Sequence, residues 1–268
     1  ITDGGGTQTV ALSSLQDGVD DADADPTNEL QTLSVSAAGD TLHLQNGGFV
    51  IIPGISAANA SGGGGTYPGG TVHCNGTPTA IVDVTNPTTG AIWMDRNLGA
   101  TQAATSSTDV DAYGDLYQWG RFSDGHQCRT SATNPTLSSV DQPAHGDFII
   151  GASDWRSPQN DNLWQGVNGI NNPCPSGYRI PTEAELEAER LSWSANNSTG
   201  ALASPLKLPV AGYRVNSSGS LIIVGTGGDY WSSTVSGAGS RDLYFGSSNA
   251  LMYDDIRASG FSVRCLKD

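Results

Sequence analysis

The first part of the chain lacks basic side chains. Residues 1–95 contain ten acidic residues and no lysine or arginine, and the first basic residue is Arg96. The whole chain has 12 basic and 27 acidic residues, a formal net charge of −15. Phosphate binding requires clustered lysine and arginine, so this balance excludes a nucleic acid partner and disfavours an anionic lipid surface. Trypsin-like proteases cleave after lysine or arginine, so they cannot cut within residues 1–95. This resistance suits a protein that is exposed outside the cell.

The chain also lacks long apolar runs and the common catalytic patterns. No run approaches the ~20 apolar residues that cross a bilayer, so we expect no membrane span. The sequence begins at Ile1 rather than Met, and we expect that a leader has been removed. It contains no Gly-x-Ser-x-Gly elbow and no phosphate loop, and its four histidines show no metal-ligand spacing. We therefore predict a secreted protein that is not an enzyme.

The cysteines lack the spacing of a metal or redox site. Cys74, Cys128, Cys174 and Cys265 form an even set without any Cys-x-x-Cys pair, which disfavours zinc and thioredoxin-type chemistry. Disulfides formed in an oxidising compartment are the better interpretation, and they agree with an extracellular or cell-surface location. The spacing alone leaves all three pairings open.

Composition divides the chain into four parts. Residues 1–29 form an acidic extended arm with too few apolar residues to fold alone. Residues 30–60 contain three short β-rich runs and turn signals, which predict a small all-β module. Residues 61–70 are a glycine-rich linker, and residues 71–268 form the large domain.

The small β module has the features of an assembly element. A sheet of three short strands has unpaired edges that accept a strand from another chain. We expect the arm of one subunit to pair with the module of a neighbour, giving a homo-oligomer or fibre. The apolar positions that this contact would cover are Leu33, Val35, Leu42, Leu44 and Ile51.

The acidic arm contains one pattern that suggests a cofactor. Asp21, Asp23 and Asp25 are spaced by two and followed by Glu29, as at the beginning of an oxygen-ligand calcium loop. However, Pro26 stands where the standard loop has glycine, and no acid occupies the twelfth position. Two interpretations stay open: a calcium site, and a solvated acidic arm, which these departures favour.

The large domain has the pattern of an α+β protein. Residues 79–84 and 91–94 read as paired strands around a turn, and residues 113–121 have helical spacing. Thr182 followed by Glu185 is a capping box, which predicts a helix through about residue 193. From residue 206 onward, four β segments are separated by glycine- and serine-rich turns. We expect two helices, a sheet and long loops.

Six pieces of residues 92–268 match a known pattern in order. They are IWMDRNL (92–98), YGDLYQW (113–119), NPCPSGYRIPTEAE (172–185), LPVAGYR (208–214), YWSST (230–234) and GFSVRCL (260–266). They resemble the Fibrobacter succinogenes major paralogous domain, a secreted bacterial module related to C-type lectin-like and formylglycine-generating-enzyme-like folds. The resemblance implies a C-type lectin-like domain in residues 71–268. It also implies a Cys174–Cys265 disulfide, because shorter members carry only these two positions, and this leaves Cys74–Cys128 as the second pair.

Two shorter resemblances concern the N-terminal region. Residues 23–33 are similar to repeats in stalk and fibre proteins of Bacteroidetes and their phages, which supports an assembly role. The tripeptide that contains Thr41 resembles the O-glycosylation site of secreted Bacteroidetes proteins, so Thr41 is a candidate glycosylation site.

The candidate ligand-binding residues lie in loops. The calcium-dependent sugar motifs of C-type lectins are missing, so glycan recognition would have to use aromatic and loop residues instead. Trp155 and Trp164 fall in the loop-rich stretch 122–172 and are expected to be exposed, whereas Trp93, Trp119 and Trp231 are expected in the core. The late loops resemble the display surface of retroelement-diversified variable proteins. Their candidates are Ser247, Ser248, Asn249, Tyr253, Asp254, Asp255 and Arg257.

Three functions fit these observations. The first is a structural subunit of an extracellular fibre or surface appendage, assembled through the N-terminal region. The second is an adhesin or phage receptor-binding module that recognises a glycan or protein through the late loops. The third is a formylglycine-enzyme-like oxidase, which is disfavoured because it needs reactive thiols and only Cys265 lies near the C-terminus.

Overall fold

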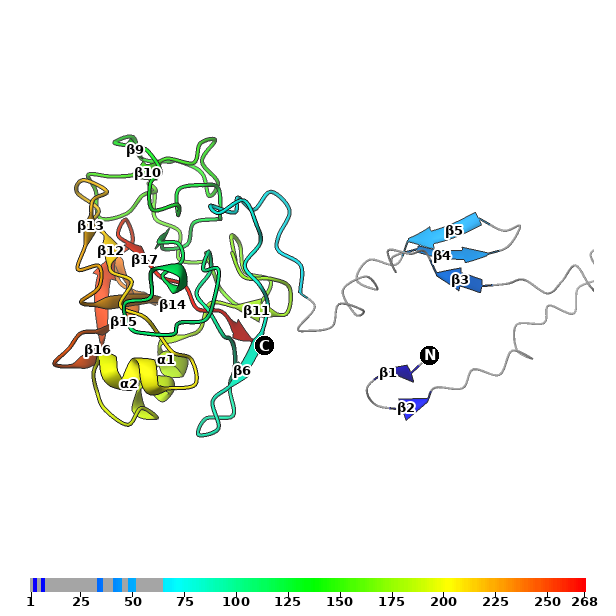
Figure 1. Cartoon of the computed structure of the whole chain (residues 1–268). Coiled ribbons are helices and arrows are strands. Elements are labelled where there is room, and N and C mark those ends of the chain that lie inside the picture. Colours follow the sequence, from blue (N-terminus) through cyan, green and yellow to red (C-terminus); the bar gives the residue numbers. More distant parts are fainter. Residues whose placement is uncertain (1, 4–5, 8–32, 36–40, 45–47, 52–64) are drawn as a thin grey trace, which may run out of the picture. The chain divides into compact units, whose positions relative to one another are not determined.

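The computed structural model describes residues 65–268 and, by backbone alone, the short strands at residues 2–3, 6–7, 33–35, 41–44 and 48–51 (Figure 1). The chain divides into two compact units, Ile1–Ser56 and Ala57–Asp268. The fold is mixed, with many strands and two α-helices among the described residues, as expected for an α+β protein. None of the described helices has the length and apolar character needed to cross a membrane.

The first unit contains two small antiparallel sheets. One pairs β1 (Thr2–Asp3) with β2 (Gly6–Thr7), and the other has the order β3 (Leu33–Val35), β4 (Thr41–Leu44) and β5 (Gly48–Ile51). Each of the three predicted β runs therefore contains a strand.

The register of the three-stranded sheet corrects one expectation about the assembly residues. Leu33 pairs with Leu44, Val35 with Leu42, and Leu42 with Val50. Because successive residues of a strand alternate between faces, Leu33, Val35, Leu42, Leu44 and Val50 share one face of the sheet. Ile51 instead pairs with Thr41 and lies on the opposite face, so a single apolar contact cannot cover all five predicted positions.

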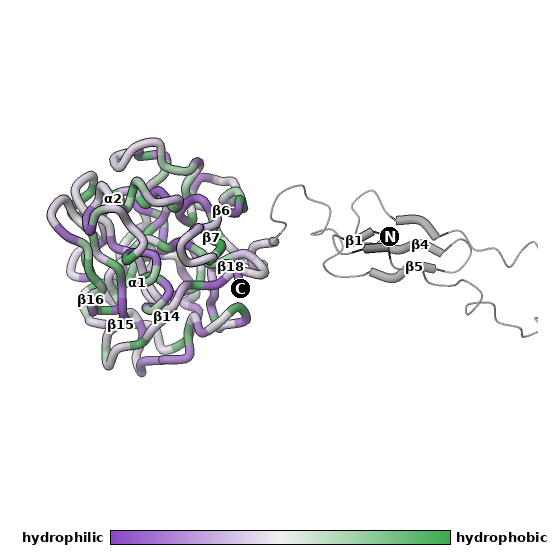
Figure 2. The backbone as a smooth tube through the Cα atoms, turned by 90° about the horizontal axis from the view of Figure 1, so that it is seen from below, coloured by the Kyte–Doolittle hydropathy of each residue, from purple (hydrophilic) through white to green (hydrophobic). Residues whose placement is uncertain are grey.

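A three-stranded antiparallel sheet organises the second unit. It consists of β14 (Gly228–Ser236), β15 (Gly239–Phe245) and β16 (Ala250–Ile256), which lie side by side in Figure 1. One face packs against α1 (Glu183–Leu191) through Tyr230, Leu243 and Phe245. The other face includes Trp231, which belongs to a second core cluster. The sheet therefore separates two hydrophobic cores, and hydrophobic residues occur in elements throughout the unit (Figure 2).

Shorter elements surround this sheet. One four-stranded sheet has the order β11 (Tyr178–Arg179), β18 (Leu266–Lys267), β7 (Ile92–Met94) and β6 (Asp83–Thr85). Another has the order β13 (Leu221–Ile222), β12 (Tyr213–Arg214), β17 (Gly260–Phe261) and β8 (Tyr117–Gln118). The remaining elements are the parallel pair β9 (Thr133–Asn134) and β10 (Phe148–Ile149), the 3₁₀ turn η3 (Val110–Ala112) and α2 (Ser198–Ala203).

The predicted strand pair and the predicted capping box are both present. β6 and β7 pair antiparallel around the expected turn. The side chain of Thr182 accepts from the Glu185 N–H, and Glu185 accepts in return from the Thr182 N–H at 2.7 Å. This reciprocal cap begins α1 where the sequence predicts it.

The predicted helix over residues 113–121 is wrong. The segment contains the short strand β8, and Gly114 and Gly120 adopt φ values of +67° and +78°. Tyr113, Leu116 and Trp119 are all buried, whereas a surface helix of this length would expose one side. A Cβ at Gly120 would lie 2.9 Å from Leu163, so the backbone approaches that side chain too closely for any other residue.

The disulfides join Cys74 to Cys128 and Cys174 to Cys265, the two pairs that the sequence analysis predicted. They close loops with sequence separations of 54 and 91 residues. Loops of this length correspond to a stabilisation of roughly 3–5 kcal/mol each in the chain-entropy account. All four thiols are therefore engaged, and the second bridge ties the segment before α1 to the end of the chain.

The cap of α1 generates a stability prediction. Thr182→Ala removes the acceptor for the Glu185 N–H, and we expect the free energy of unfolding to fall by about 1 kcal/mol in chemical denaturation. The control is Thr199→Ala in α2, because Asn197 rather than Thr199 caps that helix. The control should change stability by less than about 0.5 kcal/mol. Equal losses in the two variants would contradict the assigned cap.

Candidate functional site

The structure places Trp155 and Trp164 in the core, so the prediction that they are exposed is wrong. Both side chains are 0% exposed. The Trp155 Nε1–H donates to the Trp119 carbonyl at 2.7 Å, and the Trp164 Nε1–H donates to the Asn171 carbonyl at 2.9 Å. In a segment with little regular structure, these indoles fill the core and bind main-chain carbonyls, so they cannot act as a stacking platform.

The late candidates divide between a turn, a strand and the core. Ser247, Ser248 and Asn249 are exposed in the turn between β15 and β16. Tyr253, Asp254 and Asp255 lie within β16 rather than in a loop, which corrects the sequence interpretation. Because strand residues alternate, Tyr253 and Asp255 share one face of the sheet and Asp254 lies on the other. These residues therefore do not form one continuous display surface.

Arg257 is a structural residue, which corrects its assignment as a ligand contact. Its side chain is 1% exposed, and its guanidinium carbon lies 4.3 Å from the centre of the Trp119 ring. Its Nη2 donates to Asp161 at 2.7 Å. A guanidinium stacked on a buried indole and paired with a carboxylate holds loops together and has no free donor face for a ligand.

The predicted calcium ligands Asp21, Asp23, Asp25 and Glu29 lie outside the described residues. Thr41, the candidate glycosylation site, is the first residue of β4, and nothing in the backbone tests its modification. Among the residues that the structure describes, no three carboxylate, imidazole or thiol groups are arranged to hold one metal ion.

A group of carboxyls on the central sheet is the most unusual electrostatic feature of the second unit. Asp229 pairs with Tyr244, Trp231 with Asp242, and Ser240 with Asp255. By strand alternation, Asp229, Asp242 and Asp255 all lie on the sheet face that includes Trp231. We call these three residues the acidic sheet face. Asp229 and Asp242 are 6% and 1% exposed, so two carboxyls are buried within a protein interior.

Burial perturbs the protonation of this face. It raises the pKa of Asp242 to about 9, and the negative charges of Asp229 and Asp255 add to the effect. Burial and the charge of Asp255 raise the pKa of Asp229 to about 7. The pKa of Asp255 is also raised, chiefly by burial. Like charges in a region of low polarity disfavour the ionised form, and such perturbed carboxyls mark functional candidates.

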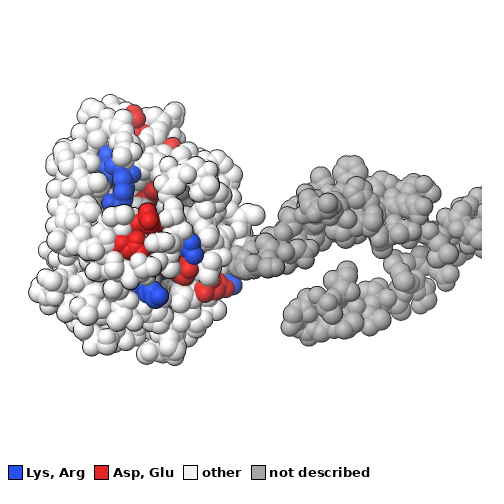
Figure 3. Space-filling model, in the orientation of Figure 1, with Lys and Arg blue, Asp and Glu red and all other residues white. Residues whose placement is uncertain are grey.

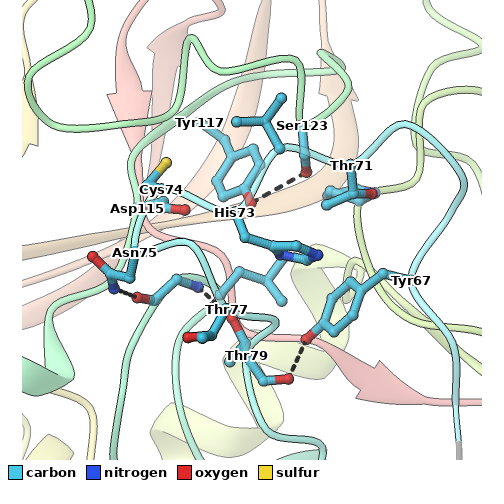
Figure 4. Close-up of a pocket in the computed structure, with 14 residues that line it drawn as sticks. Tyr67, Thr71, His73, Cys74, Asn75, Thr77, Thr79, Asp115, Tyr117 and Ser123 are labelled. Carbon is cyan, nitrogen blue, oxygen red and sulfur yellow. Dashed lines mark hydrogen bonds between the residues drawn. The ribbon is translucent and has the colours of Figure 1, made fainter.

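Another perturbed carboxyl, Asp115, borders a small cavity (Figure 4). Burial raises the pKa of Asp115 to about 7, and Gly99, whose φ is +82°, leaves the space that this carboxyl fills. Tyr67 donates to the Thr79 carbonyl at 3.1 Å, and Thr79 Oγ1 accepts from the Gly99 N–H at 2.7 Å. The cavity volume of about 10 Å³ accommodates about one water molecule, so it is too small for an organic ligand.

A larger groove of about 640 Å³ lies on the surface of the second unit. Its lining contains no charged side chain. Its apolar groups include the aromatic rings of Tyr67 and Phe122. Its polar groups include the side-chain amides of Gln142 and Asn168. A groove of this size and composition can hold a neutral ligand that presents hydroxyls or amides together with an apolar face.

Comparison of the chain with protein family models, with curated proteins and with solved structures gave no significant match.

The sequence analysis did not identify Asp229 and Asp242 as site residues. Their signal in the sequence is an acid placed two residues from an aromatic one within a β run, in Asp229-Tyr-Trp231 and Asp242-Leu-Tyr244. This pattern places each acid on an aromatic face of its own strand, but the pairing of the strands decides that the acids share one face.

The raised pKa values predict that the second unit loses stability as pH increases. A carboxyl whose pKa is higher in the folded state binds its proton more tightly there, so its contribution is complete below the unfolded pKa of about 3.9. The contribution is then lost as pH rises, up to about 7 for Asp229 and about 9 for Asp242. We therefore expect the contribution of these two carboxyls to the free energy of unfolding to fall between pH 4 and pH 9. Buried His126, whose pKa is lowered from 6.5 to about 4, contributes in the opposite direction in the lower part of this range, so the net fall is expected above about pH 6.5.

The variant Asp242→Asn tests the origin of this loss. An amide carries no charge, so the variant should have the same free energy of unfolding as the parent near pH 4. At pH 8 its free energy of unfolding should exceed that of the parent by more than about 1 kcal/mol, because a shift of one pKa unit corresponds to about 1.36 kcal/mol. Asp254→Asn, an exposed residue on the opposite face, is the control; its charge is the smallest contribution to the raised pKa of Asp242, so this variant should change the pH dependence much less than Asp242→Asn does. Denaturant unfolding at both pH values measures the difference. Parallel pH profiles for the parent and Asp242→Asn would contradict the assignment.

Proposed function

We propose that the protein is a secreted structural subunit of an extracellular fibre or surface appendage. In this proposal the N-terminal region assembles subunits, and residues 71–268 are a C-type lectin-like domain of the Fibrobacter succinogenes major paralogous type displayed on the outside. The two disulfides and the absence of a membrane-spanning helix among the described residues are compatible with an extracellular protein. No catalytic role is included, because the oxidase alternative needs a free thiol and all four cysteines are paired.

The observation that carries this proposal is the separate sheet of the first unit. Its outer strands β3 and β5 each pair with β4 on one side only, among the strands that the structure describes. The register gives this sheet one face with five apolar positions, Leu33, Val35, Leu42, Leu44 and Val50. A three-stranded sheet with an apolar face and two open edges needs a partner surface to be stable, and a second subunit supplies one.

The surface of the second unit supports a display role. Figure 3 shows a face with large uncharged areas, on which acidic and basic side chains lie close together. Many charged groups form local pairs, such as Arg179 with Glu185 at 2.7 Å and Lys267 with Asp83. Because its basic groups are paired within the domain, this unit has little unpaired positive charge with which to bind the acidic arm. We therefore assign assembly to the apolar sheet of the first unit.

The assembly proposal is tested by two adjacent substitutions in the full chain. Leu42→Lys places a charge on the apolar face of the central strand, and we expect it to give a monomer. His43→Lys introduces the same charge on the opposite face and should assemble like the parent. Light scattering after size exclusion and negative-stain microscopy give the oligomeric state, and near-ultraviolet circular dichroism reports on the second unit. A monomeric parent chain, or assembly of both variants, would show that this face does not mediate assembly.

A second candidate function is favoured by the uncharged groove. In this alternative the protein is an adhesin or phage receptor-binding module that recognises a glycan or protein. Tyr67 and Phe122 offer ring faces, and the amides of Gln142 and Asn168 offer paired donors and acceptors, which suit a hydroxyl-rich ligand. The groove is a candidate surface beside the exposed late residues Ser247, Ser248, Asn249 and Tyr253, whereas Trp155, Trp164 and Arg257 are buried and cannot contact a ligand.

A glycan array followed by titration of any ligand found tests this second function. Phe122→Ala should lower the affinity at least tenfold, because an aromatic contact is worth about 1.4 kcal/mol or more at the centre of a site. Tyr253→Ala removes an exposed aromatic of β16 and serves as the control with unchanged affinity. A ligand whose affinity depends on Tyr253 and not on Phe122 would return the site to the late segment. The absence of any array ligand removes glycan recognition as a function.

A further inference from the structure

The outer strand of the central sheet has an open edge. β16 pairs with β15 on one side, and no described strand pairs with its other side (Figure 1). Seven residues are a long stretch for an uncovered edge, because unpaired N–H and carbonyl groups accept a strand from another chain. Tyr253, at the middle of β16, is 55% exposed and is the only exposed aromatic residue in residues 65–268. This edge is therefore a candidate interaction surface.

The hairpin turn determines which main-chain groups face the open edge. The Gly246 N–H donates to the Asn249 carbonyl at 2.9 Å, so these residues form a hydrogen-bonded pair beside the turn. Hydrogen-bonded and non-hydrogen-bonded pairs alternate along an antiparallel ladder, and the register of β15 and β16 continues without a shift. The residues whose N–H and carbonyl groups point away from β15 are therefore Ala250, Met252, Asp254 and Ile256.

Local contacts occupy the two ends of this edge. At one end, Arg190 of α1 donates to the Ala250 carbonyl at 3.4 Å. At the other end, the Ile256 N–H donates to the Asp255 side chain at 2.6 Å. The Ile256 carbonyl accepts from the Ser259 N–H at 3.0 Å. A partner strand therefore finds its free hydrogen-bonding groups in the middle of β16.

The groups in the middle lie symmetrically about one residue. Within residues 65–268, nothing bonds to the outward N–H and carbonyl groups of Met252 and Asp254, which stand on either side of Tyr253. An antiparallel partner satisfies all of these groups when it presents the same pattern in the reverse direction. A second copy of β16 presents that pattern.

We propose that β16 is a self-association surface, at which a second copy of this chain pairs antiparallel about a twofold axis through Tyr253. Met252 of each copy then lies opposite Asp254 of the partner subunit, and the open groups on both edges become hydrogen-bonded. Tyr253 lies opposite Tyr253 of the partner subunit in a non-hydrogen-bonded pair, where cross-strand side chains are closest. The two three-stranded sheets become one continuous sheet.

The placement of charge supports this register. Asp254 lies opposite an apolar residue, Met252 of the partner subunit. Asp255 likewise lies opposite Leu251 of the partner subunit, so no carboxylate stands directly opposite another. An axis through Asp254 would place two carboxylates opposite each other. An axis through Met252 would set Asp254 against Ala250, whose carbonyl is already hydrogen-bonded.

The size of the contact predicts a weak dimer. A strand of seven residues is about 24 Å long, and pairing along its edge buries less than the roughly 1,200 Å² of a stable interface. In dilute solution a chain that carries Leu42→Lys therefore stays monomeric, and it dimerises when concentrated. A twofold contact closes on itself, so in a fibre it joins subunits sideways rather than head to tail. Many such contacts act together between two fibres.

A proline at the open edge tests the pairing. The background is the full-length Leu42→Lys chain, in which the N-terminal contact is removed. Asp254→Pro deletes one outward N–H at an exposed position and leaves the ladder to β15 intact, as edge strands tolerate. Asp254→Ala removes the same carboxylate but keeps the N–H, so it is the matched control. In sedimentation equilibrium over a concentration series, Asp254→Ala should dimerise like the background, and Asp254→Pro should associate at least about tenfold more weakly.

Cysteine cross-linking tests the register and does not depend on how the N-terminal region assembles. Residues directly opposite each other in a non-hydrogen-bonded pair are close enough to form a disulfide. Tyr253→Cys should therefore give a covalent dimer under mild oxidation, both in the parent chain and in Leu42→Lys. Ser248→Cys is the control, because this exposed turn residue lies far along the strand from its counterpart in the partner subunit. Non-reducing electrophoresis and peptide mapping identify the bond.

Three results would overturn the proposal. They are no dimer at concentrations up to about 1 mM, equal association of folded Asp254→Pro and Asp254→Ala, and cross-linking of Ser248→Cys as complete as that of Tyr253→Cys. If near-ultraviolet circular dichroism shows that Asp254→Pro is unfolded, the cross-link decides. A Tyr253→Cys dimer in chains that form no fibre supports this contact and rejects the fibre, and fibres without the cross-link give the reverse conclusion.

Discussion

Buried guanidinium and indole nitrogens hold the second unit together by donating to main-chain carbonyls. Arg214 donates to the carbonyls of Cys128, Ser131 and Gly219, and Arg264 donates to those of Met94 and Leu206. A buried carbonyl without a donor costs about 1–3 kcal/mol. Because the α-helices of residues 65–268 comprise only residues 183–191 and 198–203, this part of the chain has many carbonyls outside regular structure. These side chains satisfy the carbonyls of the loops, as backbone hydrogen bonds satisfy the carbonyls of helices and sheets.

The same use of arginine explains why the acidic sheet face is distinctive. With positive charges committed to loop carbonyls and to partners such as Glu183 and Glu185, none is available for Asp229 and Asp242. The sheet that these carboxyls occupy also separates the two hydrophobic cores, through Tyr230 and Leu243 on one face and Trp231 on the other. Protonation of this face therefore acts on the element that both cores share.

The candidate site was only partly predictable, for identifiable reasons. Trp155 and Trp164 lie in a segment rich in loop residues, and composition predicts exposure there, but tertiary packing turned the loops inward around these indoles. The sequence places Asp254 and Asp255 in a late loop, but their pairing with Arg241 and Ser240 extends β16 through Ile256. The groove combines residues 66–69, Phe122 and residues 167–177, which no local pattern could bring together.

By itself the sequence determined the local features and their covalent framework: the α+β class, the β6–β7 pair, the capped start of α1 at Thr182 and, through a family resemblance, the pairing of all four cysteines. These depend on contacts between residues close in sequence or on recurring motifs. Only the tertiary structure decided that residues 113–121 are not a helix, that Arg257 is buried against Trp119, and that Asp229 and Asp242 share a sheet face. Strand register and the burial of loops arise from contacts between distant residues, and hydrophobic periodicity carries no information about which segments meet.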